Sequence, residues 1–381
     1  MEKMKKRIGN GIVAAIIAVG AAGLILAGIS YKALTEKRSA SGAGASVAGI
    51  TGTVSGELTK TAQAAGAAPV EQHGALHVSG TDLKDSHGAK FQLKGVSTHG
   101  IAWFPQYVNK DAFQTLRDNY GINTIRLAMY TNKSEGYGPD AVKKVREGVK
   151  YATELGMYVI IDWHILNDGN PNQHKSEAKK FFTKMSKKYG SQKNVIYEIC
   201  NEPNGNVTWN KQIKPYAKTM VKVIRKHSKN AVIVIGTPTW SQLGTDGTSN
   251  EVADSPIKGY KNIMYSLHFY ASEWAHNEYL PAKVAYARKK KLPIIVSEFG
   301  LSPASGDGAI NKASADKWMK LLNKYNISYF CWSLSNKNES ASLLKPSTKK
   351  TSGWKSGDLS TAGKYIKKKY LARKKALGKK A

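Results

Sequence analysis

The strongest constraint on the fold is a regular alternation of short apolar runs with longer amphipathic stretches. Eight apolar runs are candidate strands, at 95–97, 124–130, 158–164, 195–201, 232–237, 263–270, 293–298 and 327–333. Helix-like segments separate them at 139–155, 177–189, 209–227, 279–290 and 314–325, and a last one at 360–371 would close the fold. A repeated strand–helix order favours parallel strands joined by right-handed crossovers. The pattern therefore predicts an α/β fold, a (β/α)8 TIM barrel over residues 75–372.

Residues 76–93, ahead of the first candidate strand, are expected to form an N-terminal β-hairpin. Two alternating segments flank Asp85-Ser-His-Gly88, and a polar turn with glycine between such segments is typical of a hairpin. We expect this hairpin to cover the floor of the barrel.

The first 34 residues are predicted to be a signal or transmembrane segment. Basic residues between positions 3 and 7 precede a mostly apolar run over 8–29, long enough to cross about 30 Å of hydrocarbon as a helix. Positive charge ahead of the run keeps the N-terminus inside, so the rest of the chain is expected to be extracellular. A retained membrane anchor is favoured because the run exceeds the roughly 7–15 residues of a signal peptide, and cleavage near Gly28-Ile-Ser30 stays open.

Composition assigns the remaining segments. Residues 35–74 are small and polar with almost no aromatic side chains, which predicts a flexible linker, and 373–381 form a basic tail. The formal net charge of +31 comes mainly from lysines spread over helix-like stretches. Without a nucleic-acid motif, this pattern favours a solvated basic surface, with an anionic wall or membrane surface as the alternative. We expect a monomer that does not bind nucleic acid.

The only two cysteines, Cys200 and Cys331, fall in candidate strands four and eight. These strands lie on opposite sides of an eight-stranded barrel, farther apart than the roughly 4.4–6.8 Å between the Cα atoms of a disulfide. Two buried free thiols are therefore predicted.

Two glutamates carry the functional prediction. Glu202 and Glu298 lie at or just after the ends of candidate strands four and seven, and the C-terminal strand ends of a barrel meet on the face where its enzymes place catalytic groups. Two carboxyls in one cleft are what cleavage of a glycosidic bond requires, since one protonates the leaving oxygen and the other attacks or stabilises the sugar cation. The pair therefore indicates a glycoside hydrolase.

Other polar and aromatic residues lie at the same strand ends. In chain order they are His99, Trp103, Arg126, Asp162, His164, Asn201, Trp240, His268, Tyr270, Trp332 and Lys337. Arg126 alternates with apolar residues, so it is expected to point into the barrel mouth, where a buried charge needs a partner. The histidines lack metal-site spacing and the carboxylate pair accounts for them, so we expect no catalytic metal and no cofactor.

The chain resembles the catalytic domain of glycoside hydrolase family 5 endoglucanases, the cellulases of the Bacillus and Clostridium type. The resemblance covers about residues 76–371 and rests on Ile199-Cys-Asn-Glu-Pro-Asn-Gly205, Leu267-His-Phe-Tyr270, Ser297-Glu-Phe-Gly300 and Cys331-Trp-Ser-Leu-Ser-Asn-Lys337. It implies a retaining endo-β-1,4-glucanase acting on cellulose-like polysaccharide, with Glu202 as acid/base and Glu298 as nucleophile. We expect the neighbouring carboxylate and the pocket to raise the pKa of Glu202, and hydrogen bonds to keep Glu298 ionised.

The resemblance also implies which residues bind the substrate or support the pair: His99, Trp103, Arg126, His164, Asn201, Trp240, His268, Tyr270, Trp332, Lys337 and Glu339. Asn201 would contact the sugar 2-hydroxyl and Tyr270 the nucleophile, while the three histidines complete the floor. The three tryptophans would stack on glucose rings, and Lys337 and Glu339 would bind a sugar on the non-reducing side.

One segment departs from the family pattern. After Tyr270 the relatives carry a short segment with Gly, Thr and His, whereas this chain has Ala271-Ser-Glu-Trp-Ala-His276. Contacts on the leaving-group side therefore stay open, and Trp274 is a candidate for an additional stacking surface.

Two alternatives to a cellulase stay open from the sequence. A β-mannanase or mixed-linkage glucanase could use the same scaffold, because the choice of substrate rests on loop contacts to single hydroxyls. A non-catalytic wall adhesin could bind sugar in the same groove, although a pure binder has no need of an acid and a nucleophile.

Overall fold

The computed structural model describes residues 68–378, in which parallel strands close into a barrel. The barrel strands are β3 (Lys94–Thr98), β4 (Thr124–Tyr130), β5 (Tyr158–His164), β6 (Val195–Glu198), β7 (Ile233–Ile235), β8 (Ile263–Tyr270), β9 (Ile294–Gly300) and β10 (Tyr329–Leu334). Each strand pairs with the next, and β10 pairs with β3. The predicted eight-stranded TIM barrel is therefore confirmed.

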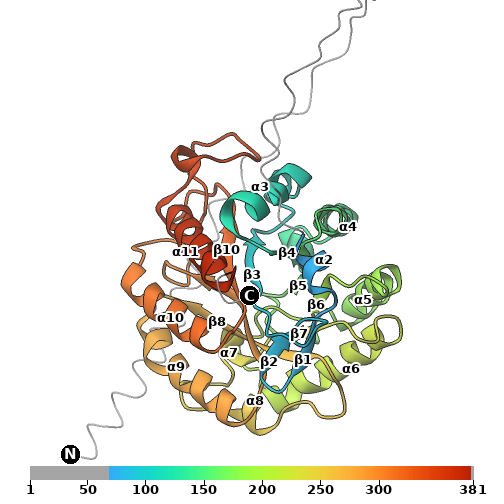
Figure 1. The fold of residues 1–381 in the computed structure, drawn as a ribbon. Helices are drawn as coiled ribbons and strands as arrows, with labels where there is room; N and C mark the ends of the chain where they lie inside the picture. Colours follow the sequence, from blue (N-terminus) through green and yellow to red (C-terminus); the bar gives the residue numbers. More distant parts are fainter. Residues whose placement is uncertain (1–67, 379–381) are drawn as a thin grey trace, which may run out of the picture. The chain divides into compact units, whose positions relative to one another are not determined.

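Helices surround the strands (Figure 1). The longer ones are α3 (Lys110–Tyr120), α4 (Pro139–Glu154), α5 (Lys175–Tyr189), α6 (Lys214–Arg225), α9 (Trp274–Lys289), α10 (Lys312–Lys324) and α11 (Thr361–Gly378). Short segments are α2 (Pro69–His73), α7 (Pro238–Ser241), α8 (Glu251–Asp254), η1 (Pro105–Tyr107), η2 (Lys133–Glu135), η3 (Trp209–Ile213) and η4 (Ser356–Asp358). Local signals set the ends of α3, because Asn109 caps its N-terminus and Gly121 ends it in a left-handed conformation.

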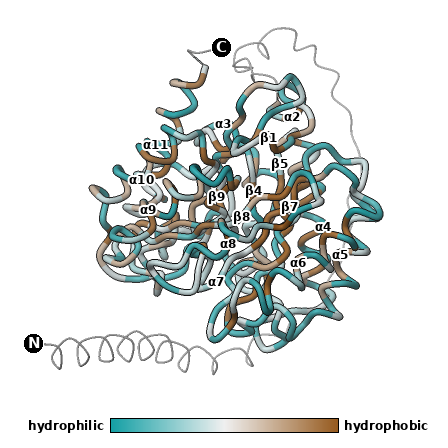
Figure 2. Tube along the Cα trace, turned by 90° about the horizontal axis from the view of Figure 1, so that it is seen from below, coloured by the Kyte–Doolittle hydropathy of each residue, from teal (hydrophilic) through white to brown (hydrophobic). Residues whose placement is uncertain are grey.

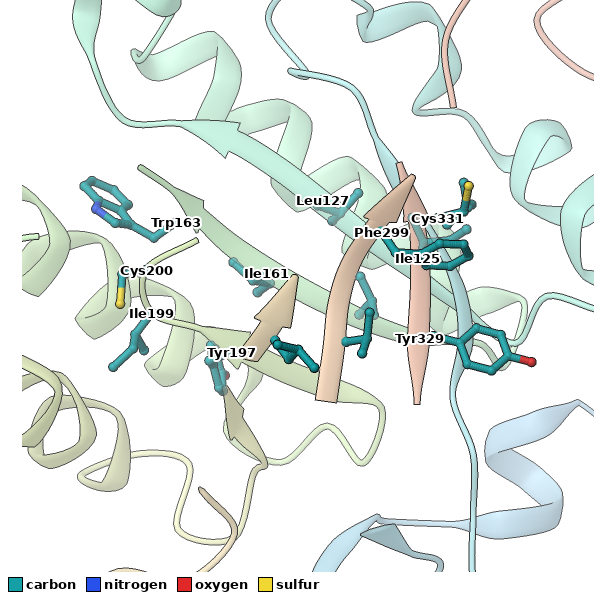
Figure 3. Close-up of a cluster of buried hydrophobic side chains, with 14 of the residues drawn as sticks. Ile125, Leu127, Ile161, Trp163, Tyr197, Ile199, Cys200, Phe299, Tyr329 and Cys331 are labelled. Atoms are coloured by element: carbon teal, nitrogen blue, oxygen red, sulfur yellow. The ribbon is translucent and has the colours of Figure 1, made fainter. Parts of the chain in front are cut away.

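Period-two alternation along the strands separates the outer core from the barrel interior. Ile125, Leu127 and Ile161 belong to the main apolar core, and Figure 3 shows them with other buried side chains of neighbouring strands. Arg126 and Asp162, which alternate with them, point inward and contact each other. In Figure 2 the apolar stretches concentrate on the central strands.

An antiparallel ribbon packs at the N-terminal end of the barrel. It pairs β1 (His77–Ser79) with β2 (Asp82–Lys84), so its turn comes before the predicted turn at Asp85–Gly88. Around Asp85–Gly88 there is a single β-bridge, between Lys84 and Lys90. Leu83 shares a buried cluster with interior residues such as Ile196 and Phe330. The barrel interior is thus filled with apolar side chains at this end, which leaves the opposite end for chemistry.

Several element boundaries differ from the sequence-based expectations. Helix α9 begins at Trp274 rather than near 279, and α11 continues to Gly378 rather than ending near 371. Residues 69–73, assigned to the linker, form α2, and the hydroxyl of Tyr158 donates to the carbonyl of Gly74. These differences arise because tertiary contacts extend or order segments whose local composition is polar.

Cys200 and Cys331 are free and buried, which confirms the predicted thiols. The apolar run over 8–29 lies outside the described residues. Within residues 68–378, no helix has both the length and the apolar character needed to cross a bilayer.

Candidate active site

Arg126 organises the C-terminal half of the barrel interior. Its Nε donates to Glu198 Oε2 at 2.7 Å, its Nη1 to Glu298 Oε2 at 3.0 Å, and its Nη2 lies 3.0 Å from Asp162 Oδ2. Nη2 also donates to Asn201 Oδ1 at 2.5 Å. The guanidinium is completely buried, and surrounding carboxylates raise the pKa of Arg126 although burial opposes this. One fixed cation therefore joins residues from four strands or strand ends.

Glu202 and Glu298 face each other in this mouth. A carboxylate oxygen of each residue and a ring nitrogen of His268 all lie within 4.8 Å of one another. Glu298 accepts hydrogen bonds from Arg126 and from the hydroxyl of Tyr270, the latter at 2.8 Å. Glu202 Oε1 lies 2.8 Å from His268 Nδ1. The nucleophile candidate thus contacts a cation, whereas the acid candidate contacts an imidazole.

A β-bulge in β9 aims Glu298 into the mouth. Ser266 of β8 pairs with Ile295 and His268 pairs with Glu298, so β9 contains one residue more than its neighbour over this stretch. The pairing of β9 with β10 shifts in the same way. Ser297 and Glu298 consequently both reach the interior, where Ser297 contacts Glu198 and Glu298 contacts Arg126.

Burial raises the pKa of both carboxyls. The pKa of Glu202 is raised to about 8 by burial, with Arg126 opposing and the charges of Asp162 and Glu198 adding to the rise. Burial and the charge of Glu202 raise the pKa of Glu298, although His268 and Arg126 lower it. Because two like charges at this distance repel, the pair favours a state that retains one proton. The hydrogen bonds from Arg126 and Tyr270 favour the ionised form of Glu298.

Hydrogen-bond directions place that proton on Glu202. Ser297 donates to Glu198 Oε1 at 2.6 Å, so its oxygen must accept from His268 Nε2, which lies 2.9 Å away. Burial lowers the pKa of His268 to about 4, so the ring is neutral near pH 7 and its Nδ1 carries no proton. Nδ1 must therefore accept from Glu202, which requires a protonated carboxyl. Ser297 of β9 thus determines, through His268, that Glu202 is protonated.

An aromatic wall forms one side of the mouth. Trp332 stacks on His164 with ring centroids 5.3 Å apart and lies 5.1 Å from the ring of His99. Trp103, which is 43% exposed, lies 5.6 Å from His99 and 4.7 Å from Tyr130. Such faces suit the apolar C–H surface of a sugar ring.

Both histidines of this wall are neutral. Burial lowers the pKa of His99 and of His164 to about 3. His164 Nδ1 lies 2.6 Å from Asp162, and its Nε2 lies 3.3 Å from the side-chain amide of Asn201. Burial raises the pKa of Asp162 to about 7, against the effect of Arg126.

Lys337 and Glu339 lie at the rim beside His99. Lys337 Nζ is 2.6 Å from Glu339 Oε2, while Glu339 Oε1 is buried without a hydrogen-bond partner and lies 3.7 Å from His99 Nε2. Burial raises the pKa of Glu339 although Lys337 opposes it. A buried, unpaired acceptor at the rim of the barrel mouth is positioned to bind a ligand hydroxyl.

Trp240 extends from the other side, next to Glu202. Its backbone N–H donates to the carbonyl of Pro203 at 3.0 Å, and its ring is 42% exposed. Thr239, Trp240 and Ser241 all have positive φ, a conformation costly for side-chain-bearing residues. The hydroxyl of Ser241 donates to the carbonyl of Asn201 at 2.6 Å, which anchors this strained loop.

Side-chain contacts join twelve of the thirteen predicted site residues, whereas Trp240 is attached through its backbone N–H to the carbonyl of Pro203. The structure also adds three residues that were not predicted from the sequence. Glu198, Ser297 and Tyr130 are buried in the same mouth. The sequence did contain a signal for Glu198. It lies two residues after Ile196, on the same face of an otherwise apolar strand, which indicates an inward charge that needs a partner, as for Arg126.

Glu202, His268 and Glu298 are also close enough to hold a metal ion. Both nitrogens of His268 already have partners, and Arg126 lies against Glu298. A second cation would repel the guanidinium, so these residues suit acid and nucleophile chemistry better than metal binding.

Comparisons with known proteins agree with this geometry. The family model described as Cellulase (glycosyl hydrolase family 5) matches residues 84–338. Endoglucanase 5 of Pectobacterium carotovorum subsp. carotovorum is 44% identical over 85% of this chain and 63% of its own length. An endoglucanase of Clostridium saccharobutylicum is 46% identical over 77% of this chain and 64% of its own length. The chain thus spans less than two thirds of these two relatives.

A solved structure is similar over almost its full length. The catalytic domain of Thermobifida fusca endoglucanase Cel5A, in complex with cellotetraose, covers 80% of this chain and 99% of its own, at 35% identity and a TM-score of 0.75. The matched family residues contain both glutamates of the mouth, and they span most of the barrel. The chain therefore belongs to glycosyl hydrolase family 5, the cellulase family.

Proposed function

We propose that this protein is a retaining endo-β-1,4-glucanase that cleaves internal bonds of cellulose-like glucans by double displacement. The observation that carries the proposal is the approach of Glu202 and Glu298, whose nearest oxygens lie within 4.8 Å. Carboxyl groups about 5–5.5 Å apart are typical of retaining enzymes, because an inverting enzyme needs space for a water molecule between carboxylate and sugar.

In the first step, Glu298 attacks the anomeric carbon and forms an ester as the glycosidic bond breaks. Glu202 gives its proton to the leaving oxygen. In the second step, Glu202 takes a proton from water, which attacks the anomeric carbon and releases Glu298. The raised pKa of Glu202, about 8, supports its role as the acid near neutral pH.

The surrounding residues are assigned supporting roles. Arg126 and Tyr270 donate to Glu298 and favour its ionised form once Glu202 holds the shared proton. Asn201, held by Arg126, is assigned to the sugar 2-hydroxyl, and His268 orients Glu202. Glucose rings on one side of the cleavage point are assigned to the aromatic residues His99, His164, Trp103 and Trp332. Trp240 is assigned to a glucose ring on the other side. Lys337 and Glu339 are assigned to sugar hydroxyls.

Release of reducing sugar from carboxymethylcellulose tests the proposal. Wild-type protein should be active, and Glu298→Ala should lose nearly all activity while keeping its thermal unfolding temperature. Proton NMR of cellotetraose cleavage should show the β-anomer first. Equal activity in the two proteins, or the α-anomer first, would reject the retaining assignment.

A substrate panel separates this function from its alternatives. Purified mannan and mixed-linkage glucan should be cleaved more slowly than carboxymethylcellulose. Faster cleavage of either would assign the other specificity on this scaffold. Retention on insoluble glucan without hydrolysis would instead identify an adhesin.

The enzyme is proposed to act outside the cell as a monomer, tethered by the apolar run over 8–29. Residues 35–67 would separate the barrel from the membrane. N-terminal sequencing of the native protein decides between a retained anchor and a cleaved signal. An N-terminus after position 30, with the protein in the culture medium, would exclude the tether.

A further inference from the structure

Three exposed tryptophans and a tyrosine lie on segments that follow barrel strands at their C-terminal ends. Among residues 68–378, the exposed large hydrophobic side chains are Trp103, Trp240, Trp274, Tyr279 and Leu371. Trp274 is 68% exposed, and it contacts Tyr279, which is 39% exposed, with ring centroids 5.9 Å apart at 80°. Both belong to the first turns of α9, directly after β8. Contacting exposed aromatic rings at the active-site end of an enzyme mark a binding surface.

The Trp274–Tyr279 pair is fixed to the loop that carries Trp240. The side-chain amide of Gln242 lies 3.1 Å from His276 Nε2. Gln242 follows Trp240 by two residues and His276 follows Trp274 by two, so this contact links the segments that carry the two tryptophans. Lys283 Nζ donates to the carbonyl of Gln242 at 3.0 Å. The ring of Tyr279 packs against Gly247, where a Cβ atom would approach the ring to 2.8 Å. The pair is therefore attached to the loop that carries Trp240 through contacts at Gln242 and Gly247.

The same contacts tie this surface to the reacting groups. The backbone N–H of Tyr270 donates to His276 Nδ1 at 2.9 Å, and the hydroxyl of Tyr270 donates to Glu298. The backbone N–H of Trp240 donates a hydrogen bond to the carbonyl of Pro203, the residue after Glu202. The acid must reach the leaving oxygen, so the side of the mouth next to Glu202 receives the leaving part of the glucan. The aromatic wall around Trp332 lies on the opposite side.

We propose that Trp274 and Tyr279 form an additional sugar-binding surface that holds glucose units of the leaving part of a β-1,4-glucan beyond Trp240. This inference rests on the proposed function. Its chemistry is the stacking of a pyranose ring on the exposed indole, with the tyrosine ring supporting it edge to face. The surface favours long chains over short ones, since only a long leaving part reaches it.

Binding to the nucleophile variant Glu298→Gln tests the surface without turnover. By isothermal titration calorimetry, adding Trp274→Ala should weaken cellohexaose binding about tenfold, whereas cellotriose, which has too few units, should change less than about twofold. Trp274→Phe should retain most of the affinity because it keeps an aromatic face. Leu371→Ala is the matched control, since it removes another exposed apolar side chain on α11.

Kinetics in the active enzyme give an independent reading. The ratio of kcat/KM for cellohexaose to that for cellotriose should fall at least about fivefold in Trp274→Ala and stay unchanged in Leu371→Ala. Unchanged ratios and affinities in Trp274→Ala would overturn the inference while leaving the glucanase assignment intact. A wild-type protein that cleaves no glucan would instead reject the proposed function itself.

Discussion

Ser297 donates a hydrogen bond to Glu198 at 2.6 Å, and this single contact decides which atom of the neighbouring His268 carries a proton. A serine hydroxyl has one proton, so the Ser297 oxygen is left to accept from His268 Nε2. The neutral imidazole then offers only an acceptor to Glu202. Glu198 in turn is held by Arg126, so the acid and the nucleophile are connected through four intervening side chains.

Ser297→Ala should shift the basic side of the pH profile. In the wild type, kcat/KM should fall as pH rises through about 8, because Glu202 must be protonated to act as an acid. Without the hydroxyl, His268 can carry its proton on Nδ1 and donate to an ionised Glu202, which lowers the pKa of Glu202. We expect the basic limb on cellotetraose to move down by about one pH unit.

Ser266→Ala is the matched control for this prediction. Ser266 contacts the hydroxyl of Ser297 in the same buried cluster, but it does not fix the direction of the bond from His268. Its basic limb should stay in place. With a dinitrophenyl cellobioside, whose leaving group needs no proton, Ser297→Ala should keep most of its activity, and an equal loss on both substrates would indicate a merely structural serine.

The position of Glu298 shows where the sequence stops informing the site. Ile295 faces the barrel interior, so strict alternation puts Ser297 inside and Glu298 outside with Val296. The extra residue in β9 brings Glu298 inside together with Ser297. Nothing in Ile294-Ile-Val-Ser-Glu-Phe-Gly300 marks the bulge, because it is set by pairing with β8 and β10. The place of Glu298 at the end of an apolar run, rather than the alternation along that run, indicated this residue.

The sequence predicts the fold more completely than it predicts the site. Apolar runs are local properties, so the strands were located within a few residues and the barrel followed from their order. The network of Arg126, Glu198 and Ser297 depends on which strands become neighbours across the interior. Helix starts such as Trp274 were missed because an exposed polar turn carries no apolar periodicity.

Arg126→Lys should be far from conservative. A lysine cannot contact Asp162, Glu198 and Glu298 together, so at least one buried carboxylate loses its partner. We expect the free energy of unfolding to fall by about 3–5 kcal/mol, and kcat to fall about 10³-fold where the protein stays folded. Urea denaturation measures the free energy of unfolding, and cellotetraose kinetics measure kcat. The control Arg146→Lys, on the exposed face of α4, should leave the free energy of unfolding and kcat unchanged. Wild-type stability in Arg126→Lys would contradict the buried network.

The two cysteines should be inert in the folded protein. Cys200 and Cys331 are fully buried, and burial raises the pKa of both thiols, so almost no thiolate is present. A chromogenic disulfide reagent should label neither thiol in native protein and both after unfolding in guanidinium chloride. Rapid labelling of the folded protein at pH 8 would show that the barrel opens far more readily than its packing implies.

Gly236→Ala should displace the segment that carries Glu202. A Cβ atom at Gly236 would lie 2.1 Å from the carbonyl oxygen of Cys200 and 2.7 Å from that of Asn201, so backbone next to the acid must move. Because a shift of about 1 Å at a catalytic group costs about 10²-fold, kcat should fall by that order, beyond any loss of stability. Gly138→Ala is the control, since nothing lies within 4 Å of its added Cβ atom and its φ of 174° is open to any residue. Steady-state kinetics at a temperature where both variants are folded separates the loss of kcat from the loss of stability. A wild-type kcat in Gly236→Ala would show that Glu202 tolerates displacement of the backbone next to it.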